Sequence, residues 1–326
     1  MARFGVESKR VWMALVIAYL VWGSTYLAIR VADETIPPFA MAAARFLIAG
    51  SILFAFSARR GDRRGDPIGW PQWRAAALIG GLLLLVGNGG VVWAEQRVAS
   101  SVTALIVALV PIWMALIAAY RKAERVPFRV VLALAVGFGG TALLVKAAGS
   151  GGGAVSAAGV AVLCGAVIAW ALGSVLSRTA ELPRRPLVAT AMEMLCGGAM
   201  LAVLAAATGE LGHVHPSRIS GSSLAGFLYL IAFGSLVAFS AYVWLLQNAS
   251  TSLVSTYAYV NPVVAVLLGW AILGERVTGW MLLAGTLIVS AVALIVMAEG
   301  SRRRPGEVVE PAAPEAARGS PANAPA

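Results

Sequence analysis

Long apolar stretches separated by short polar connections recur along most of the chain. A helix that crosses about 30 Å of hydrocarbon needs about 20 mostly apolar residues. Ten stretches meet this requirement, with ends placed to within several residues: 11–31, 38–58, 73–94, 98–120, 127–146, 157–177, 187–208, 223–246, 250–273 and 278–298. Connections as short as EQRVAS and QNAS suit antiparallel pairs of helices. The pattern predicts an all-α integral membrane protein with ten transmembrane helices.

Composition supports a membrane protein over a water-soluble one. Hydrophobic residues make up 60% of the chain and charged residues only 12%, whereas soluble domains contain about 45–50% and about 25%. No small-residue cleavage site follows the first apolar stretch, so we interpret it as a retained span and not as a signal peptide.

Lysine and arginine are distributed unevenly over the connections, and cytoplasmic loops carry the excess in membrane proteins. With the N-terminus inside, 19 basic residues fall on the inner side and 5 on the outer side, while Arg45 lies in the membrane. We therefore expect both termini to be cytoplasmic. The net charge of +10 is explained by these loops and does not indicate nucleic-acid binding.

An internal repeat relates the two halves of the chain. At an offset of 148 residues Trp22 matches Trp170 and Arg30 matches Arg178; at an offset of 151, Trp93 matches Trp244 and Pro111 matches Pro262. Each repeat holds five spans, an odd number, so the second copy is expected to enter the bilayer inverted. Inverted repeats are a recurring plan of transporters, with the substrate site at the midplane between the halves. Similar halves can exchange conformations, which gives alternating access from the two sides.

The predicted organisation has five parts. It comprises a cytoplasmic N-terminus (1–10), a first five-helix repeat (11–148), a Gly/Ser linker (149–156), a second five-helix repeat (157–298) and a disordered cytoplasmic tail (299–326). The linker is glycine-rich, and the tail has too few apolar residues to fold.

Three features resemble the EamA-type branch of the drug/metabolite transporter superfamily: VWGSTYLAIR in the first span, Arg45 in the second, and the stretch that begins YAYVNPVV and continues through LGERV. The resemblance covers nearly everything from Val11 to Ala298, although the first repeat lacks the glycine before its Glu-Arg pair. It implies a multi-pass exporter of small metabolites, amino acids or drugs in the bacterial cytoplasmic (inner) membrane. Cargo, direction of transport, coupling ion and oligomeric state stay open.

Arg45 and Glu193 occupy equivalent positions of the two repeats, each roughly 10 Å inside the bilayer at 1.5 Å per residue. A charge at such depth costs about 2.5–3.5 kcal/mol on an insertion scale, so each needs a wet cavity or a polar partner. Arg45 is a candidate for binding anionic cargo, and Glu193 is the candidate for proton coupling. The alternative is that both residues only fix helix packing.

Pro111 and Pro262 are expected in the middle of the fourth and ninth spans. Proline removes a backbone donor from the carbonyl four residues earlier, here those of Val107 and Ala258. Such carbonyls are tolerated at membrane depth where they line a cavity. The recurrence of the two prolines favours a gating hinge over accidental kinks.

Aromatic and small polar residues near the span centres are the other candidates for the cavity. Aromatic residues also serve as interface anchors, and small polar residues also serve helix packing. The candidates for substrate binding, besides Arg45, are Trp22, Ser24, Asn88, Trp170, Ser174, Tyr257, Tyr259 and Asn261.

Other chemistry finds little support in the sequence. Cys164 and Cys196 lack metal-ligand spacing, and the only histidines, His213 and His215, fall in an outer loop. We therefore expect no cofactor, no metal and no enzyme activity. An intramembrane enzyme, such as a lipid-modifying enzyme or a protease, and a passive uniporter or channel are the alternatives. The expected partners are a small-molecule substrate and the lipid bilayer, with protons left open.

Overall fold

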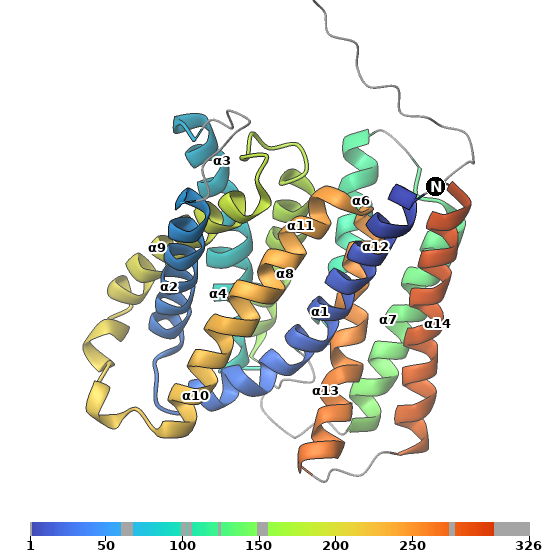
Figure 1. The fold of residues 1–326 in the computed structure, drawn as a ribbon. Helices are drawn as coiled ribbons and strands as arrows, with labels where there is room; N and C mark the ends of the chain where they lie inside the picture. Colours follow the sequence, from blue (N-terminus) through green and yellow to red (C-terminus); the bar gives the residue numbers. More distant parts are fainter. Residues whose placement is uncertain are drawn as a thin grey trace, which may run out of the picture.

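The computed structural model describes residues 2–59, 68–98, 103, 106–122, 125–148, 156–273 and 278–302. Throughout these residues the chain is helical with short connections, and no strand occurs among them. The helices run up and down beside one another (Figure 1). Helices suit an apolar environment because each satisfies its own backbone N–H and C=O groups. The predicted all-α class is confirmed.

The first half of the chain begins with two long helices and ends with a shorter pair. Its elements are α1 (Ala2–Ala32), α2 (Pro38–Arg59), α3 (Trp70–Gly80), the π-helical η1 (Gly81–Asn88), α4 (Gly89–Glu95), α6 (Val110–Lys122) and α7 (Phe128–Ala148). The segments α3, η1 and α4 follow one another without a break. Helix α1 already starts at Ala2, so the predicted N-terminal segment 1–10 continues the first helix; no proline interrupts it.

The second half also begins with two long helices and contains a helix with a π-helical segment. Its elements are α8 (Ala157–Leu176), α9 (Pro186–Ala207), the 3₁₀ turns η2 (Glu210–His213) and η3 (Pro216–Arg218), α10 (Gly221–Tyr229), the π-helical η4 (Leu230–Phe239), α11 (Ser240–Asn248), α12 (Thr251–Ser255), α13 (Tyr257–Leu273) and α14 (Gly279–Arg302). Of the predicted linker, residues 149–155 lie outside the described part of the chain, as do residues 303–326 of the predicted tail.

Among the residues that the structure describes, six helical stretches are long and apolar enough to cross a membrane: Lys9–Ala32, Pro38–Ser57, Trp70–Glu95, Ala157–Leu176, Pro186–Ala207 and Gly221–Asn248. Shorter apolar helices occupy Val110–Arg121, Phe128–Leu143 and Gly279–Ile295. The described residues thus contain several membrane-spanning helices, and the number ten stays a prediction.

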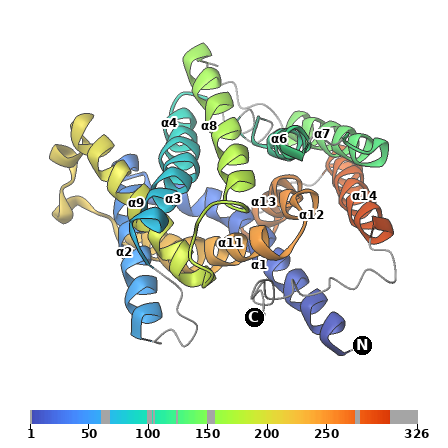
Figure 2. The same cartoon turned by 90° about the horizontal axis from the view of Figure 1, so that it is seen from above.

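Helices of the two halves pack against each other in matching pairs. Helix α2 lies along α9 and α7 along α14, at opposite sides of the molecule (Figure 2). Helix α1 contacts α13, α10 and η4, while α8 contacts α6, η1 and α4. In the α2–α9 pair, a Cβ on Gly50 would lie 3.1 Å from Cγ of Leu195, and a Cβ on Gly198 would lie 3.0 Å from Cγ of Leu47. The same glycine–leucine contact therefore occurs twice.

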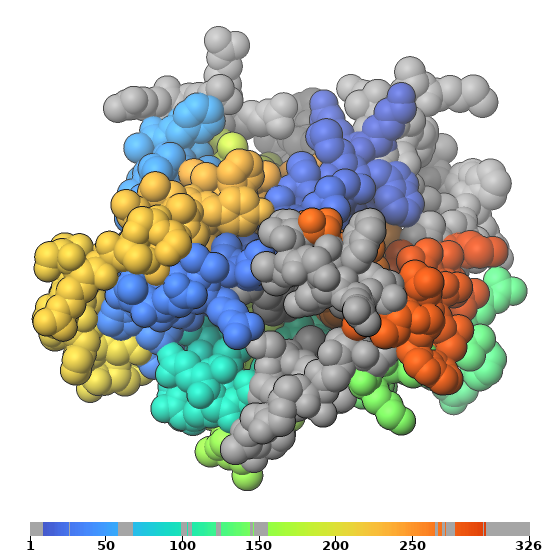
Figure 3. Space-filling view, turned by 90° about the horizontal axis from the view of Figure 1, so that it is seen from below, coloured from blue at the N-terminus to red at the C-terminus, as the bar shows by residue number. Residues whose placement is uncertain are grey.

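The start of α1 and the end of α14 lie at the same end of the molecule, here called the terminal end (Figure 1). At the opposite end, the Glu210 carboxylate accepts the backbone N–H groups of Phe39 at 2.8 Å and Ala40 at 3.0 Å, and so caps α2. Figure 3 shows this face, where the segment after α9 (yellow) lies beside the connection of α1 to α2 (blue).

Candidate functional site

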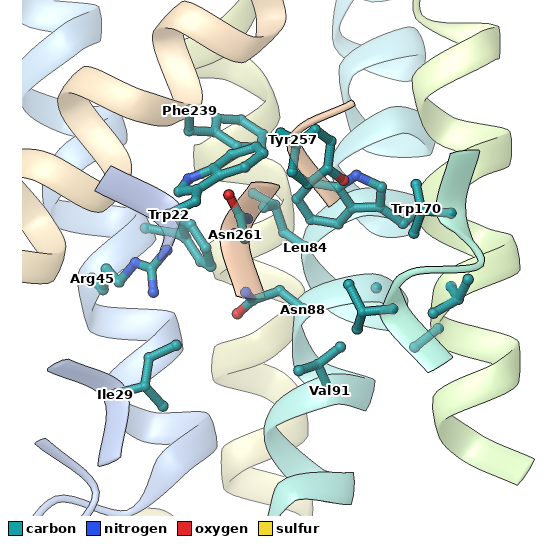
Figure 4. Close-up of a pocket in the computed structure, with 16 residues that line it drawn as sticks. Trp22, Ile29, Arg45, Leu84, Asn88, Val91, Trp170, Phe239, Tyr257 and Asn261 are labelled. Atoms are coloured by element: carbon teal, nitrogen blue, oxygen red, sulfur yellow. The ribbon is translucent and has the colours of Figure 1, made fainter. Parts of the chain in front are cut away.

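A cavity of about 110 Å³ lies between the two halves (Figure 4). Its wall is mostly apolar and comes from α1, α2, η1, α4, α6, α8, η4 and α13, together with Val107. Helix α1 approaches α13 closely because Gly23 has no side chain: a Cβ there would lie 2.6 Å from Cβ of Val264. Six of the residues that the sequence nominates line the cavity: Trp22, Arg45, Asn88, Trp170, Tyr257 and Asn261.

Arg45 brings a positive charge to this wall although its side chain is only 5% exposed. Its Nε donates to Oγ of Ser235 on η4 at 2.7 Å, and its guanidinium carbon lies 4.5 Å from the centre of the Phe46 ring. Figure 4 shows the guanidinium group directed toward the side where Asn88 and Asn261 lie. Guanidinium groups bind carboxylates and phosphates through several N–H groups at once, so this wall suits an anionic group.

Asn88 and Asn261 add hydrogen-bonding capacity to the same cavity. Asn88 is the last residue of η1, and Asn261 follows the first turn of α13. The Oδ1 atoms of both side chains are buried without a hydrogen-bond partner. Buried polar atoms are seldom left unpaired, and ligand sites are a recognised exception.

Aromatic side chains from four helices meet at one side of the cavity. The ring centres of Trp22 and Tyr257 are 4.9 Å apart, and those of Trp22 and Trp170 are 5.8 Å apart. Tyr242 lies behind them, 4.9 Å from Trp22, and its hydroxyl accepts the indole N–H of Trp170 at 3.1 Å. Such contacts add about 0.5–1.5 kcal/mol per pair to simple burial. We call Trp22, Trp170, Tyr242 and Tyr257 the aromatic cluster.

Three nominated residues lie elsewhere. Ser24 hydrogen-bonds the Tyr229 hydroxyl at 2.6 Å, and Ser174 hydrogen-bonds that of Tyr242 at 2.6 Å, so both connect helices. Tyr259 packs on α7, where a Cβ on Gly137 would lie 2.8 Å from its ring, and its hydroxyl donates to the carbonyl of Leu134 at 3.3 Å. None of the three lines the cavity.

Glu193 is fully buried on α9, and neither carboxylate oxygen has a hydrogen-bond partner. It lies outside the cavity lining. Its backbone carbonyl instead faces Gly80 of α3. The two helices are so close there that a Cβ on Gly80 would not fit. Arg45 and Glu193 occupy matching sequence positions, but only Arg45 faces the cavity.

The two prolines differ in their surroundings. Pro262 lies inside α13, as expected. Pro111, expected in the middle of a continuous span, is instead the second residue of α6 and follows a turn at residues 108–109. A proline in the first helical turn removes no intrahelical bond, because the N–H groups there have no partner within the helix. The described ninth span is also divided, at Thr256, into α12 and α13.

The sequence pattern did not single out Asp33, which follows α1 beside the cavity's charged wall. The residue interacts electrostatically with Arg45 and with Glu210. Burial, and then the neighbouring Glu210, raise the pKa of this carboxyl to about 7, although Arg45 opposes the shift. Its Oδ1 is buried without a hydrogen-bond partner. A carboxylate directly after a span, close to an arginine inside the next span, was the available indication.

The described part of the chain holds neither a group of metal ligands nor a pair of bonded cysteines. No group of three or more His, Cys, Asp or Glu side chains there is placed to hold a metal ion. Cys164 and Cys196 are both free thiols. The cavity wall itself offers a positive charge, hydrogen-bonding side chains and aromatic rings.

Comparison with known proteins gives one consistent result. The EamA-like transporter family matches residues 10–146 and again residues 157–297. The chain is 40% identical to the uncharacterized inner membrane transporter YedA of Escherichia coli K12 over 87% of this chain and 90% of that protein. It is 26% identical to a probable terminal-alkyne amino-acid exporter of Streptantibioticus cattleyicolor, over 91% of this chain and 96% of the other. A crystal structure with 24% identity covers 91% of this chain and 99% of its own, with a TM-score of 0.72, and supports the fold alone.

Proposed function

The chain belongs to the EamA-like transporter family, and we propose that it carries a small molecule with an anionic group across the bacterial inner membrane by alternating access. The observation that carries this proposal is the position of Arg45, a buried guanidinium at the wall of a cavity between the two halves. A buried charge of this kind is costly to maintain and marks a functional site by default. Asn88, Asn261 and the aromatic rings of the same wall give the cargo polar and apolar partners.

Two inverted five-helix repeats are part of the proposal. The glycine–leucine contact between α2 and α9 supports them, because its two copies are related by the sequence offset of 148 residues. The helix contacts support them as well: α1 meets η4 and α13 as α8 meets η1 and α6. In such a scaffold the ten predicted spans form a first repeat over 11–148 and a second over 157–298.

The aromatic cluster supplies a barrier for alternating access. Trp22, Tyr242 and Tyr257 contact one another on the side of the cavity that faces the terminal end, and the Tyr19 hydroxyl hydrogen-bonds that of Thr256 beside them. Separation of these contacts would open a path to the terminal end. We propose Pro262 as the hinge on α13 and retain Pro111, at the start of α6, as its counterpart. For proton coupling we propose Asp33, because it interacts electrostatically with Arg45 of the cavity wall; Glu193, the candidate that the sequence indicates, lies outside the cavity lining and stays the alternative.

Location and direction follow from the relatives and from charge. YedA is named an inner membrane transporter, and the Streptantibioticus protein is named an exporter of an amino acid. The basic connections gather at the terminal end, which we place in the cytoplasm, so that both termini are cytoplasmic. Export of small metabolites, amino acids or drugs is the direction we propose. An intramembrane enzyme is the weaker alternative, because the relatives are named as transporters.

Transport can be tested by counterflow in liposomes that contain the purified full-length chain. A panel of labelled amino acids, monocarboxylates and cationic drugs is offered to vesicles preloaded with the same compound. We expect accumulation of carboxylates and not of cations, and a loss of about ten- to a hundredfold in apparent affinity for Arg45→Gln, since a hydrogen bond to a charged group contributes about 1.5–3 kcal/mol. Arg45→Lys should retain part of the affinity.

The matched control is Arg74→Gln, which removes an exposed arginine of α3 outside the cavity and should transport normally. Equal affinity of the Arg45→Gln and unaltered chains for every carried carboxylate would contradict the role of Arg45. Accumulation of none of the panel by any variant would contradict the proposed cargo class.

A further inference from the structure

A second cavity of about 420 Å³ lies at the terminal end of the molecule, beyond the aromatic cluster. It lies between α6, the start of α7, the end of α8 and the start of α12. Its lining combines elements of both halves, as that of the central cavity does. The proposed transport through the central cavity gives this second cavity no role.

The charge of this second cavity is of one sign. Arg121, Arg125 and Arg178 all belong to its wall, and the other described residues of the wall are apolar or carry hydroxyl groups, without a carboxylate. Arg121 Nη2 donates to the Thr179 hydroxyl at 3.0 Å, and Arg178 Nη1 donates to the carbonyl of Ala249 at 2.7 Å. These bonds fix two of the guanidinium groups at the wall. A guanidinium has five N–H donors, so the single bond of Arg121 leaves donors for a ligand.

The two cavities lie along the same pair of helices. Helix α6 contributes Val110 to the central cavity and Arg121 to the second, about 16 Å apart at 1.5 Å per residue. Helix α8 contributes Trp170 to the central cavity and Val175 to the second, about 8 Å apart at the same rise, and Arg178 follows the end of this helix. The second cavity is therefore in line with the first and nearer the terminal end.

The aromatic cluster and the residues that hydrogen-bond it separate the two cavities. On α8, Ser174 lies between Trp170 and the end of the helix at Leu176, and it hydrogen-bonds Tyr242 of the aromatic cluster. Thr256, the partner of Tyr19, lies between Ser252 of the second cavity and Tyr257 of the first. A molecule that moves along this line meets three arginines, then aromatic rings, then Arg45.

We propose that the second cavity is a loading site, which binds the carboxylate or phosphate oxygens of anionic cargo on the cytoplasmic side before the cargo passes the aromatic cluster. Like-signed charges in a low-dielectric cleft concentrate counter-ions there by a factor of about 10 to 1,000. The loading site rests on the proposed transport function, since only that function gives the cargo a reason to pass. Anionic lipid headgroups carry the same phosphate chemistry, and the experiment separates the two sources.

The test places a reporter thiol in the second cavity of the full-length chain. Cys164→Ala and Cys196→Ala remove the native thiols, and Ser252→Cys introduces a near-isosteric one in the cavity wall. The protein is held in phosphatidylcholine nanodiscs and labelled with methanethiosulfonate reagents that carry either a sulfonate or a trimethylammonium group. The measured quantity is the ratio of the two labelling rates, which reports the local electrostatic potential.

We expect the anionic reagent to react faster, and the ratio to fall on the order of tenfold when Arg121→Gln and Arg125→Gln are combined. The pair Arg121→Lys and Arg125→Lys retains the charges and should retain the ratio, which separates loss of charge from loss of folding. The control Arg74→Gln, at the same end of the molecule, should leave the ratio unchanged. An unchanged ratio in the double glutamine variant would overturn the proposal.

Occupancy is measured with benzoate and inorganic phosphate as probes. Either anion should slow labelling in the Ser252→Cys chain, and neither should do so in the double glutamine variant. Protection that arises only when phosphatidylglycerol is added to the nanodiscs would assign the site to lipid headgroups and overturn loading of cargo. The readout requires no transport, so a failed counterflow assay with intact protection would contradict the proposed function and leave anion binding in place.

Discussion

The carboxyl of Asp33 is expected to change its protonation within the physiological pH range. Its pKa is raised to about 7, mainly by burial. Between about pH 4 and 7 the folded state therefore holds a proton that the unfolded state releases, so the free energy of unfolding falls as pH rises through this window. The charged groups that act on Asp33 are Glu210, which disfavours its ionisation, and Arg45, which favours it; Asp33 in turn acts on Glu95.

We predict that Asp33→Asn removes most of this decrease in stability between pH 4 and 7. Thermal unfolding of the purified chain, followed at pH 4, 5.5, 7 and 8, measures the effect. The exposed neighbour Glu34 provides the matched control, since Glu34→Gln should reproduce the pH dependence of the unaltered chain. A pH dependence that persists unchanged in Asp33→Asn would show that another group binds the proton.

Glu193 provides a second residue-level test. Its backbone carbonyl lies in the α3–α9 contact and its side chain is outside the cavity lining, so titration of the carboxyl has no direct access to cargo. We expect Glu193→Gln, which keeps the shape and removes the ionisable proton, to transport at the rate of the unaltered chain with the same response to a pH gradient. Counterflow with and without an imposed gradient measures this, and loss of the gradient response would assign coupling to Glu193.

The sequence nominated residues of the cavity wall where the residue type itself is unusual for its surroundings. Arg45 within an apolar span, and Trp22 and Trp170 at the repeat offset, were identifiable because charge and tryptophan are rare at such positions. Ser24, Ser174 and Tyr259, which the sequence also nominates for the cavity, do not line it, and Glu193, nominated for proton coupling, lies outside the lining as well. A span that is apolar on every face does not indicate which face lies toward the cavity. Whether a given side chain faces the cavity, another helix or the lipid could therefore not be derived from the sequence.

At the scale of the helix, Pro262 and Pro111 form a natural pair for comparison. Pro262 lies inside α13 and deprives the Ala258 carbonyl of its helical donor, whereas Pro111 lies in the first turn of α6. We predict that Pro262→Ala restores that bond, stiffens α13 and slows turnover about tenfold, which is about 1.4 kcal/mol in the barrier. Substrate affinity should change little.

The comparison with Pro111→Ala tests whether the position within the helix matters. Because Pro111 removes no intrahelical bond, its replacement should alter turnover less than that of Pro262. Rates and affinities come from counterflow at varied substrate concentration. An effect of Pro262→Ala on affinity alone would contradict a hinge.

The ends of two helices were predicted closely. The predicted span 157–177 ends one residue beyond α8, and the predicted span 187–208 is shifted by one residue from α9. The predicted span 98–120 differs more, because α6 begins only at Val110. The π-helical segments η1 and η4 were not predicted, since their sequences are as apolar as their neighbours. They end at Asn88 and Phe239, both in the cavity wall, so wider helical turns place these two side chains there. Local π geometry of this kind is frequent at functional sites.

At the scale of the whole molecule, the orientation in the membrane is open to a direct test. Glu181 lies in an exposed connection at the terminal end and Ser217 in an exposed segment at the opposite end. We predict that Ser217→Cys reacts with a membrane-impermeant thiol reagent in intact cells, and that Glu181→Cys reacts only in inverted vesicles. Reaction of both thiols from the same side would contradict the proposed topology. Gly61, a further position for this test, lies outside the described residues.

The pairing of helices could be anticipated only in part. The offset between Trp22 and Trp170 indicated two related halves, and the odd number of predicted spans indicated inversion. Which helices meet could not be derived, because every span offers a similar apolar surface to its neighbours. The side-by-side placement of α2 with α9 depends on where glycine and leucine fall, and sequence alone does not show that these residues face each other.

The doubled contact between Gly50 and Leu195, and between Gly198 and Leu47, bears on how such a chain can arise. One helix that carries both a leucine and a glycine at this spacing fits a second copy of itself that runs the opposite way. A half-length ancestor that entered the bilayer in both directions would already carry the glycine and the leucine that this helix contact requires. Fusion of two copies then adds only a fixed partner, after which each half is free to diverge.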